Sequence, residues 1–217
     1  MEEKVIIEGK SGEKSRGQAM EDGLRWFSYH FFRPFLWFFT HLHISPNSLT
    51  IIGMAFACAS GYLIAKGKIP YAAILFALSG VFDIIDGYVA KTTGNVTVFG
   101  SFLDSFSDRI SDAAIYIGLS IYYLERSQGL YVGVALSLLV MSFLISYVRA
   151  RAESLGATGK AGIMARGPRF LVLGFGLFFN GLGNWILKAV SWVLFALLLE
   201  TLVERIVKVW RELEGSK

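Results

Sequence analysis

Charged residues are scarce in this chain of 217 residues. Asp, Glu, Lys and Arg together make up 18% of it, whereas hydrophobic residues make up 54%. A soluble domain of this length carries roughly a quarter charged residues. The shortage, together with long apolar runs that no polar domain separates, indicates a single-domain membrane protein.

Two further absences narrow the class of protein. With one cysteine, Cys58, the chain cannot form an internal disulfide. The first twenty residues lack the apolar core of a signal peptide, so we expect residues 1–22 to be a flexible polar cytoplasmic tail and residues 23–213 to form the membrane domain. A net charge of +4 is more typical of a cytoplasmic membrane face than of a nucleic-acid-binding protein, so we expect no nucleic-acid partner.

Apolar segments of the right length predict an all-α membrane protein with six transmembrane helices. A bilayer core needs roughly 20 apolar residues per helix. The candidate spans are residues 48–65, 70–90, 97–124, 129–148, 169–183 and 185–203. Residues 24–42 are rich in aromatic residues but broken by charge, which predicts an N-terminal juxtamembrane amphipathic helix; a seventh, poor span is the alternative. Ser45 and Pro46 are expected to cap and begin the first span.

The distribution of basic residues predicts the orientation. With six spans both termini share one side, and the 21 lysines and arginines gather there, except for Lys66, Lys68, Arg126 and Lys188. Basic residues are enriched on the cytoplasmic side of membrane proteins. We therefore expect a multi-pass protein of the cell membrane with both termini and the active site on the cytoplasmic side.

Five aspartates interrupt the second and third apolar segments. Asp83 and Asp86 are three residues apart and share a helical face, and Asp104, Asp108 and Asp112 follow at intervals of four on another. An ionised carboxylate within a bilayer costs at least about 2.5–3.5 kcal/mol, so these side chains need a counter-charge. The short connection between the segments predicts antiparallel neighbouring helices whose acidic faces meet near the cytoplasmic end.

A divalent cation is the counter-charge that several converging carboxylates favour. We expect Asp83, Asp86, Asp104 and Asp108 to bind it, and oxygen-only ligation favours Mg²⁺, Mn²⁺ or Ca²⁺ over zinc. Two alternative interpretations remain open. The aspartates can pair with arginines at 109, 149 and 151, and Arg149 and Arg151 are candidate partners for one of them, Asp112 before the others. They can also line an ion channel or transporter, although polar residues gathered at one end of two segments favour an enzyme.

The spacing of these aspartates resembles the signature of the CDP-alcohol phosphotransferase family, D-x2-D-G-x2-A-R-x8-G-x3-D-x3-D. The matching positions are Asp83, Asp86, Gly87, Ala90, Gly100, Asp104 and Asp108. Lys91 stands where the family has arginine and keeps the positive charge without the bidentate fork. Glycine on the acidic faces leaves room for a bulky ligand, although close helix packing also explains it.

The resemblance implies six transmembrane helices, a juxtamembrane amphipathic helix, cytoplasmic termini and a homodimer, for which Gly174 and Gly176 would permit close helix contact. It implies that the four signature aspartates bind Mg²⁺ or Mn²⁺, with two ions expected, and that Asp108 is also the general base. The residues implied to contact the nucleotide are Asn47, Thr50, Asp83, Gly87, Lys91 and Gly100. For Asn47 and Thr50, a plain helix start is an equal alternative.

Two further stretches resemble the phosphatidylinositol phosphate and archaetidylinositol phosphate synthases, which use inositol 1-phosphate as the acceptor. They are Asp-Arg-Ile-Ser-Asp at 108–112 and the arginine-rich segment that includes 147–153 and 166–169. The cations expected to bind an acceptor phosphate are Arg151, Lys160, Arg166 and Arg169. Ordinary positive-inside charge accounts for part of this set.

The expected reaction is metal-dependent transfer of a substituted phosphate group from CDP-diacylglycerol or CDP-archaeol to inositol 1-phosphate, with release of CMP. The expected partners are the CDP-linked lipid donor, the phosphorylated alcohol acceptor and membrane lipids. The alternative is the same chemistry with glycerol 3-phosphate, serine or a soluble CDP-inositol.

Overall fold

The computed structural model describes residues 44–158, 162 and 164–215. In these ranges the chain is all-helical, as predicted, and contains no strand. The helices are α2 (Pro46–Ala65), α3 (Ile69–Thr92), α4 (Val98–Leu124), α5 (Gly129–Ser154), α6 (Arg166–Phe179), the short 3-10 helix η1 (Asn180–Leu182) and α7 (Asn184–Glu214). The expected polar tail at 1–22, the expected amphipathic helix at 24–42 and Lys160 lie outside the described residues.

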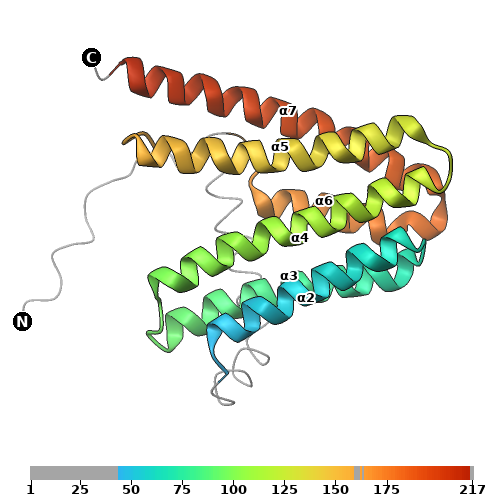
Figure 1. The fold of residues 1–217 in the computed structure, drawn as a ribbon, viewed down its shortest axis with the longest axis horizontal. Coiled ribbons are helices and arrows are strands. Elements are labelled where there is room, and N and C mark those ends of the chain that lie inside the picture. Colours follow the sequence, from blue (N-terminus) through green and yellow to red (C-terminus); the bar gives the residue numbers. More distant parts are fainter. Residues whose placement is uncertain (1–43, 159–161, 163, 216–217) are drawn as a thin grey trace, which may run out of the picture.

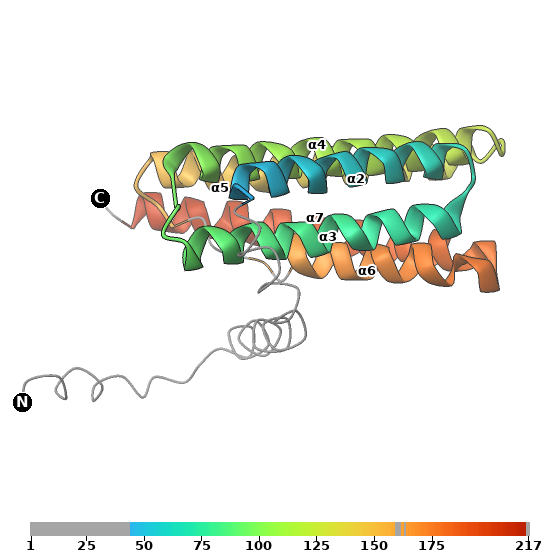
Figure 2. The same cartoon turned by 90° about the horizontal axis from the view of Figure 1, so that it is seen from below.

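The long helices lie side by side and close into a ring. Each helix packs on two others, in the order α2, α4, α5, α7, α6, α3 and back to α2. Figure 1 shows α5 and α7 along one side of the bundle, and Figure 2 shows α2 and α4 on one face with α3 and α6 on the other. This order places α3 and α6 across the ring from α4.

The prediction that α3 and α4 pack as direct neighbours is wrong. Although a short loop joins these two fully described helices, no Cα atom of one lies within 8 Å of a Cα atom of the other. Helix α2 packs against both of them instead. The separation leaves space between α3 and α4, and this space is where their acidic side chains lie.

Four described helices are long and apolar enough to cross a membrane: α2, α3, α5 and α7. Helix α6 has 14 residues, fewer than a bilayer core needs, and α4 carries the charges of Asp104, Asp108, Arg109 and Asp112 between its start and its middle. Large apolar side chains remain exposed on the outside of the bundle, as a lipid environment favours. The chain is therefore a multi-pass membrane protein.

Local signals in the sequence fix where the helices at the site begin. The Ser45 side chain accepts a hydrogen bond from the Ser48 amide at 3.2 Å, and Pro46 follows at the first helical position, as predicted for α2. Thr97 caps α4 in the same way and accepts from the Gly100 amide at 2.9 Å. Both caps stand at the end of the bundle that carries the aspartates.

Glycine allows α2 and α4 to touch closely. A Cβ added to Gly61 would meet the backbone carbonyl of Ala114, and one added to Gly118 would meet the backbone of Gly61. In lipid, such close packing stabilises helix pairs because hydrophobic burial alone does not drive their association. Gly176 also faces a helix of its own chain, since a Cβ there would lie 2.9 Å from a methyl group of Val190 on α7.

Gly61→Ala is expected to destabilise the protein by about 1–3 kcal/mol, because the backbone of α4 has to move away from the added methyl group. Gly133→Ala is the matched control, since no atom lies within 4 Å of a Cβ added there on α5. That change should be neutral or stabilising, because alanine favours helix over glycine. Thermal unfolding in detergent measures both, and equal effects of the two variants would contradict the close contact.

Candidate active site

Three of the four predicted metal-binding aspartates converge. One carboxylate oxygen each from Asp83 on α3 and from Asp104 and Asp108 on α4 lie within 4.8 Å of one another. Asp104 and Asp108 are one helical turn apart and therefore point to the same side of α4. We call these three side chains the aspartate triad. The alignment of two acidic faces that the spacing predicted is confirmed, although the two helix backbones stand apart.

Asp86 lies beside the triad and is held by a different contact. The Thr50 hydroxyl, on the first turns of α2, donates a hydrogen bond to Asp86 Oδ2 at 2.6 Å. Only 6% of Asp86 is exposed, and it lines the same pocket as Thr50, Asp83 and Asp108. Thr50 thus positions the fourth carboxylate by fixing one of its two oxygens.

The remaining signature residues lie at the same end of the bundle as this pocket. A Cβ added to Gly87 would meet nothing within 4 Å, so the backbone there is open to a ligand. A Cβ added to Gly100 would lie 3.2 Å from Asn47 Oδ1, which places the starts of α2 and α4 against each other. Lys91 is exposed on the last turn of α3.

Arg166 is the nearest cation to the triad in the part of the chain that the structure describes. It is the first residue of α6, and its Nη1 lies 2.7 Å from Asp83 Oδ1 and 2.6 Å from Asp108 Oδ1. A single nitrogen therefore bridges carboxylates from α3 and α4. The sequence predicted Arg166 for an acceptor phosphate and did not predict this bridge.

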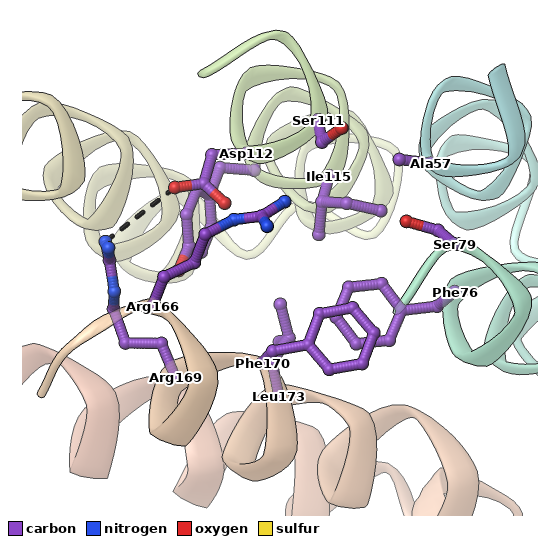
Figure 3. A pocket seen from close by; sticks show the side chains of 11 residues that line it. Ala57, Phe76, Ser79, Ser111, Asp112, Ile115, Arg166, Arg169, Phe170 and Leu173 are labelled. Carbon is purple, nitrogen blue, oxygen red and sulfur yellow. Dashed lines mark ion pairs between the residues drawn. The ribbon is translucent and has the colours of Figure 1, made fainter. Parts of the chain in front are cut away.

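Arg169 is the ionic partner of Asp112. Its Nη1 lies 3.7 Å from Asp112 Oδ2 and donates to Ser142 Oγ, while the Ser142 hydroxyl donates to Asp112 Oδ2 at 2.5 Å. Figure 3 shows Arg166 and Arg169 both rising from the start of α6 toward Asp112 on α4. The partner of Asp112 in the structure is therefore Arg169, and not the candidates Arg149 or Arg151.

Of the other predicted cations, Arg149 and Arg151 contact other residues of their own helix, whereas Arg109 lies beside an aspartate. Arg149 pairs with Glu153 at 3.0 Å on its own helix, and exposed Arg151 lies 3.4 Å from Ser154 Oγ. Arg109 lies 3.8 Å from Asp108. Two neighbouring pockets lie at this end of the bundle. Of the cations predicted to bind the acceptor phosphate, Arg166 lines both pockets and Arg169 lines one, whereas Arg151 lines neither.

Sequence reasoning missed two polar residues near these arginines. Ser142 is one of three serines in the apolar run of α5, with Ser137 and Ser146, and nothing in the sequence distinguishes it from the other two. Arg205 is buried on α7 and donates to the Ile145 carbonyl at 2.8 Å. A charge within a long apolar helix is costly, and this was the available signal for Arg205.

Comparison with known proteins identifies the family. The model of the CDP-alcohol phosphatidyltransferase family matches residues 43–202, which include all four signature aspartates. The chain belongs to the CDP-alcohol phosphatidyltransferase family. This family membership makes the chain a transferase of substituted phosphate groups and sets aside the alternative of an ion channel or transporter.

Relatives of this transferase share sequence over most of its length. An archaetidylinositol phosphate synthase of Methanothermobacter thermautotrophicus is 36% identical over 79% of this chain and 86% of the relative. A phosphatidylinositol phosphate synthase of Corynebacterium glutamicum is 36% identical over 76% of this chain and 78% of the relative.

Solved structures of the same family share the fold. The phosphatidylinositol phosphate synthase of Mycobacterium tuberculosis with CDP-DAG bound is 31% identical, with a TM-score of 0.74 over 82% of this chain and 92% of that one. A second structure of that enzyme, in complex with manganese and citrate, has the same identity and TM-score and covers 88% of that chain.

The triad of this CDP-alcohol phosphatidyltransferase fits a hard divalent cation. All donors are carboxylate oxygens, which suit Mg²⁺ and Mn²⁺. Ligand oxygens 2.0–2.1 Å from Mg²⁺ stand up to roughly 4 Å apart, so oxygens within 4.8 Å need only a small side-chain movement to share an ion.

Thr50→Val is expected to weaken Mn²⁺ binding by about 10–100-fold, because it removes the hydroxyl that orients Asp86 while keeping the side-chain shape. Thr92→Val is a matched control: the Thr92 hydroxyl donates to carbonyls of its own helix at the exposed end of α3. Isothermal titration with Mn²⁺ measures both affinities. A Thr50→Val protein that binds Mn²⁺ as tightly as the control would contradict a positioning role for Thr50.

Proposed function

We propose that this chain transfers a substituted phosphate group from a CDP-linked lipid, CDP-diacylglycerol or CDP-archaeol, to inositol 1-phosphate and releases CMP. The observation that carries the proposal is the aspartate triad with two arginines, Arg166 and Arg169, at its edge. Carboxylates hold the metal that a diphosphate needs, and guanidinium groups suit an acceptor that itself carries phosphate. The names of the relatives and the CDP-DAG bound to the similar mycobacterial enzyme support the same reaction.

The four aspartates would hold Mg²⁺ or Mn²⁺, and two ions fit a set in which Asp86 stands beside the triad. Metal at this place supplies positive charge that stabilises the diphosphate oxygens as the bond to CMP breaks. The nucleotide would lie against Asn47, Thr50, Asp83, Gly87, Lys91 and Gly100, of which Thr50 and Asp83 line the pocket. The bare backbone at Gly87 would admit the ligand closely, and Lys91 would contribute charge to the diphosphate.

Asp108 would act as the general base for the acceptor hydroxyl. It faces both Asp83 and Arg166, so it stands between the metal-binding side and the cationic side of the site. A carboxylate in this position can accept the hydroxyl proton as the acceptor oxygen attacks the lipid-linked phosphorus atom of the donor, while the bond from that phosphorus to the oxygen of the departing CMP breaks. Asp108 would then release this proton to the solvent on the side from which CMP departs.

We also propose that all six described helices cross the membrane, with both termini and the site on the cytoplasmic side. The pocket end of the bundle carries the start of α2, the end of α3, the starts of α4 and α6, and the ends of α5 and α7 (Figure 1). Lys66, Lys68, Arg126 and Lys188 all belong to the opposite end. The first half of α4 would line the cytoplasmic pocket, and η1 would lengthen the short helix α6.

A homodimer remains part of the proposal, together with a membrane domain at 23–213 that begins with the amphipathic helix at 24–42. The exposed phenylalanines of α4, Phe99, Phe102 and Phe106, form a row on the outside of the bundle. Such a row suits either lipid or a second copy. Gly176 does not serve this contact, since it packs on α7 of its own chain.

The alternative acceptors differ in charge. Glycerol 3-phosphate would use the same arginines, whereas serine would leave them without an acceptor phosphate. A soluble CDP-inositol would replace the lipid donor and not the acceptor. The two guanidinium groups at the pocket edge favour a phosphorylated acceptor over serine, and the stretches shared with inositol-phosphate-using enzymes favour inositol 1-phosphate over glycerol 3-phosphate.

A CMP-release assay on the purified protein tests the reaction. With CDP-diacylglycerol or CDP-archaeol and Mg²⁺, inositol 1-phosphate should support CMP release at least about tenfold faster than glycerol 3-phosphate or serine. Excess EDTA should abolish release, and added Mn²⁺ or Mg²⁺ should restore it. Turnover with serine but not with inositol 1-phosphate would contradict the proposed acceptor.

Asp108→Asn is expected to lower kcat by about 10²–10⁴-fold, because the amide cannot accept the hydroxyl proton, while CDP-lipid binding persists. Asp112→Asn is the control: its carboxylate pairs with Arg169, so the change should mainly raise KM for the acceptor. Steady-state kinetics separate kcat from KM, and donor binding is measured by titration. Near-normal kcat in Asp108→Asn would remove the general-base role.

A further inference from the structure

Arg166 occupies the place between two carboxylates that a metal ion would also need. Its Nη1 is 2.7 Å from Asp83 Oδ1 and 2.6 Å from Asp108 Oδ1, and both residues belong to the aspartate triad. A cation bound to the same two oxygens would lie within van der Waals distance of this nitrogen and repel its charge. The guanidinium and a divalent ion therefore cannot both bind these two oxygens at the same time.

We propose that Arg166 is an internal counter-cation that competes with divalent metal for Asp83 and Asp108, and that metal binding turns its guanidinium toward the acceptor phosphate. The proposal rests on the proposed function and adds to it the order in which metal and acceptor bind. Metal loading releases the arginine that the acceptor needs, so the acceptor site becomes complete only when the metal site is filled.

The structure provides a place to which the guanidinium can turn. Arg166 lines the aspartate pocket and also the adjoining pocket, which Asp112, Arg169 and Ser111 share (Figure 3). Its Nε is buried without a hydrogen-bond partner, as is the Nε of Arg169. Two guanidinium groups with unused donors at one pocket wall are suited to bind a tetrahedral anion.

The backbone that carries Arg166 is anchored, so the movement can be confined to the side chain. The Met164 amide donates to Thr201 Oγ1 on α7 at 3.2 Å, and the Thr158 amide and hydroxyl donate to Glu212 at 2.7 Å each. These contacts hold Thr158 and Met164 against α7. A long side chain on a fixed backbone can alternate between two anionic partners by changing its rotamers.

Competition of this kind requires reciprocal coupling between metal and acceptor. An anion that draws Arg166 away from the aspartates must raise the affinity for metal, and metal must raise the affinity for the anion by the same factor. A coupling of about 1–3 kcal/mol, common for linked sites, corresponds to about 5–150-fold. Sulfate serves as the probe anion because it has the tetrahedral shape of phosphate.

The test measures Mn²⁺ affinity by electron paramagnetic resonance of free Mn²⁺ in the purified full-length protein. Arg166→Gln should raise Mn²⁺ affinity by about fivefold or more, because the competitor is gone. Arg169→Gln is the control, since it removes an equal charge three residues along the same helix without touching the triad. It should change the affinity by less than about twofold. Equal affinities in wild type and Arg166→Gln would overturn the proposal.

The wild-type protein provides a second measurement that does not depend on any variant folding. At equal ionic strength, sulfate in place of chloride should raise wild-type Mn²⁺ affinity several-fold, and unchanged affinity would overturn the coupling. The outcome is separable from the proposed function. CMP release with inositol 1-phosphate but no effect of Arg166→Gln on Mn²⁺ would reject only the competition, whereas tighter Mn²⁺ binding in a protein that releases no CMP would reject only the reaction.

Discussion

Repulsion among carboxylates in a weakly polar environment is the constraint on which this structure depends. Asp83, Asp104 and Asp108 bring their oxygens within 4.8 Å of one another inside a helical bundle with an apolar exterior. Each charge there costs about 2.5–3.5 kcal/mol even before the charges repel one another. A positive charge among them converts this cost into an attraction, and both a metal ion and Arg166 can supply it. The site is thus built around a cation, and its chemistry follows from which cation is present.

The ring of helices makes this arrangement possible. Because α2 packs on both α3 and α4, the backbones of the two acid-bearing helices do not touch. Their acidic side chains reach one another across the gap. The glycine contact between Gly61 and Gly118 draws α2 onto α4, and Thr50 on the same helix binds Asp86 on α3. Helix α6 lies on the far side of α3 and brings Arg166 and Arg169 to the gap. One scaffold helix therefore sets the geometry of the acidic side, and one short helix sets the cationic side.

The sequence predicted the parts of this structure that depend on local pattern. Helix starts near Pro46 and Val98, the shared faces of Asp83 with Asp86 and of Asp104 with Asp108, and the gathering of arginine at one end of the bundle all follow from periodicity, caps and charge. The parts that the sequence did not predict depend on which helices touch. Loop length predicted α3 beside α4, yet packing of small residues placed α2 between them. The partner of Asp112 was missed because Arg169 reaches it across the ring from another helix, and Ser142 carries no local signal. The bridge from Arg166 to the triad was missed for the same reason, since sequence spacing says nothing about contacts 58 or more positions apart.

Anomalous diffraction from crystals grown with Mn²⁺ tests the central claim most directly, because it locates the ion against named side chains. The account predicts Mn²⁺ within about 2.5 Å of oxygens from Asp83, Asp104 and Asp108, with the Arg166 guanidinium withdrawn from Asp83 and Asp108 toward the pocket of Arg169. Mn²⁺ bound elsewhere, or the three carboxylates turned to different faces of the bundle, would contradict it.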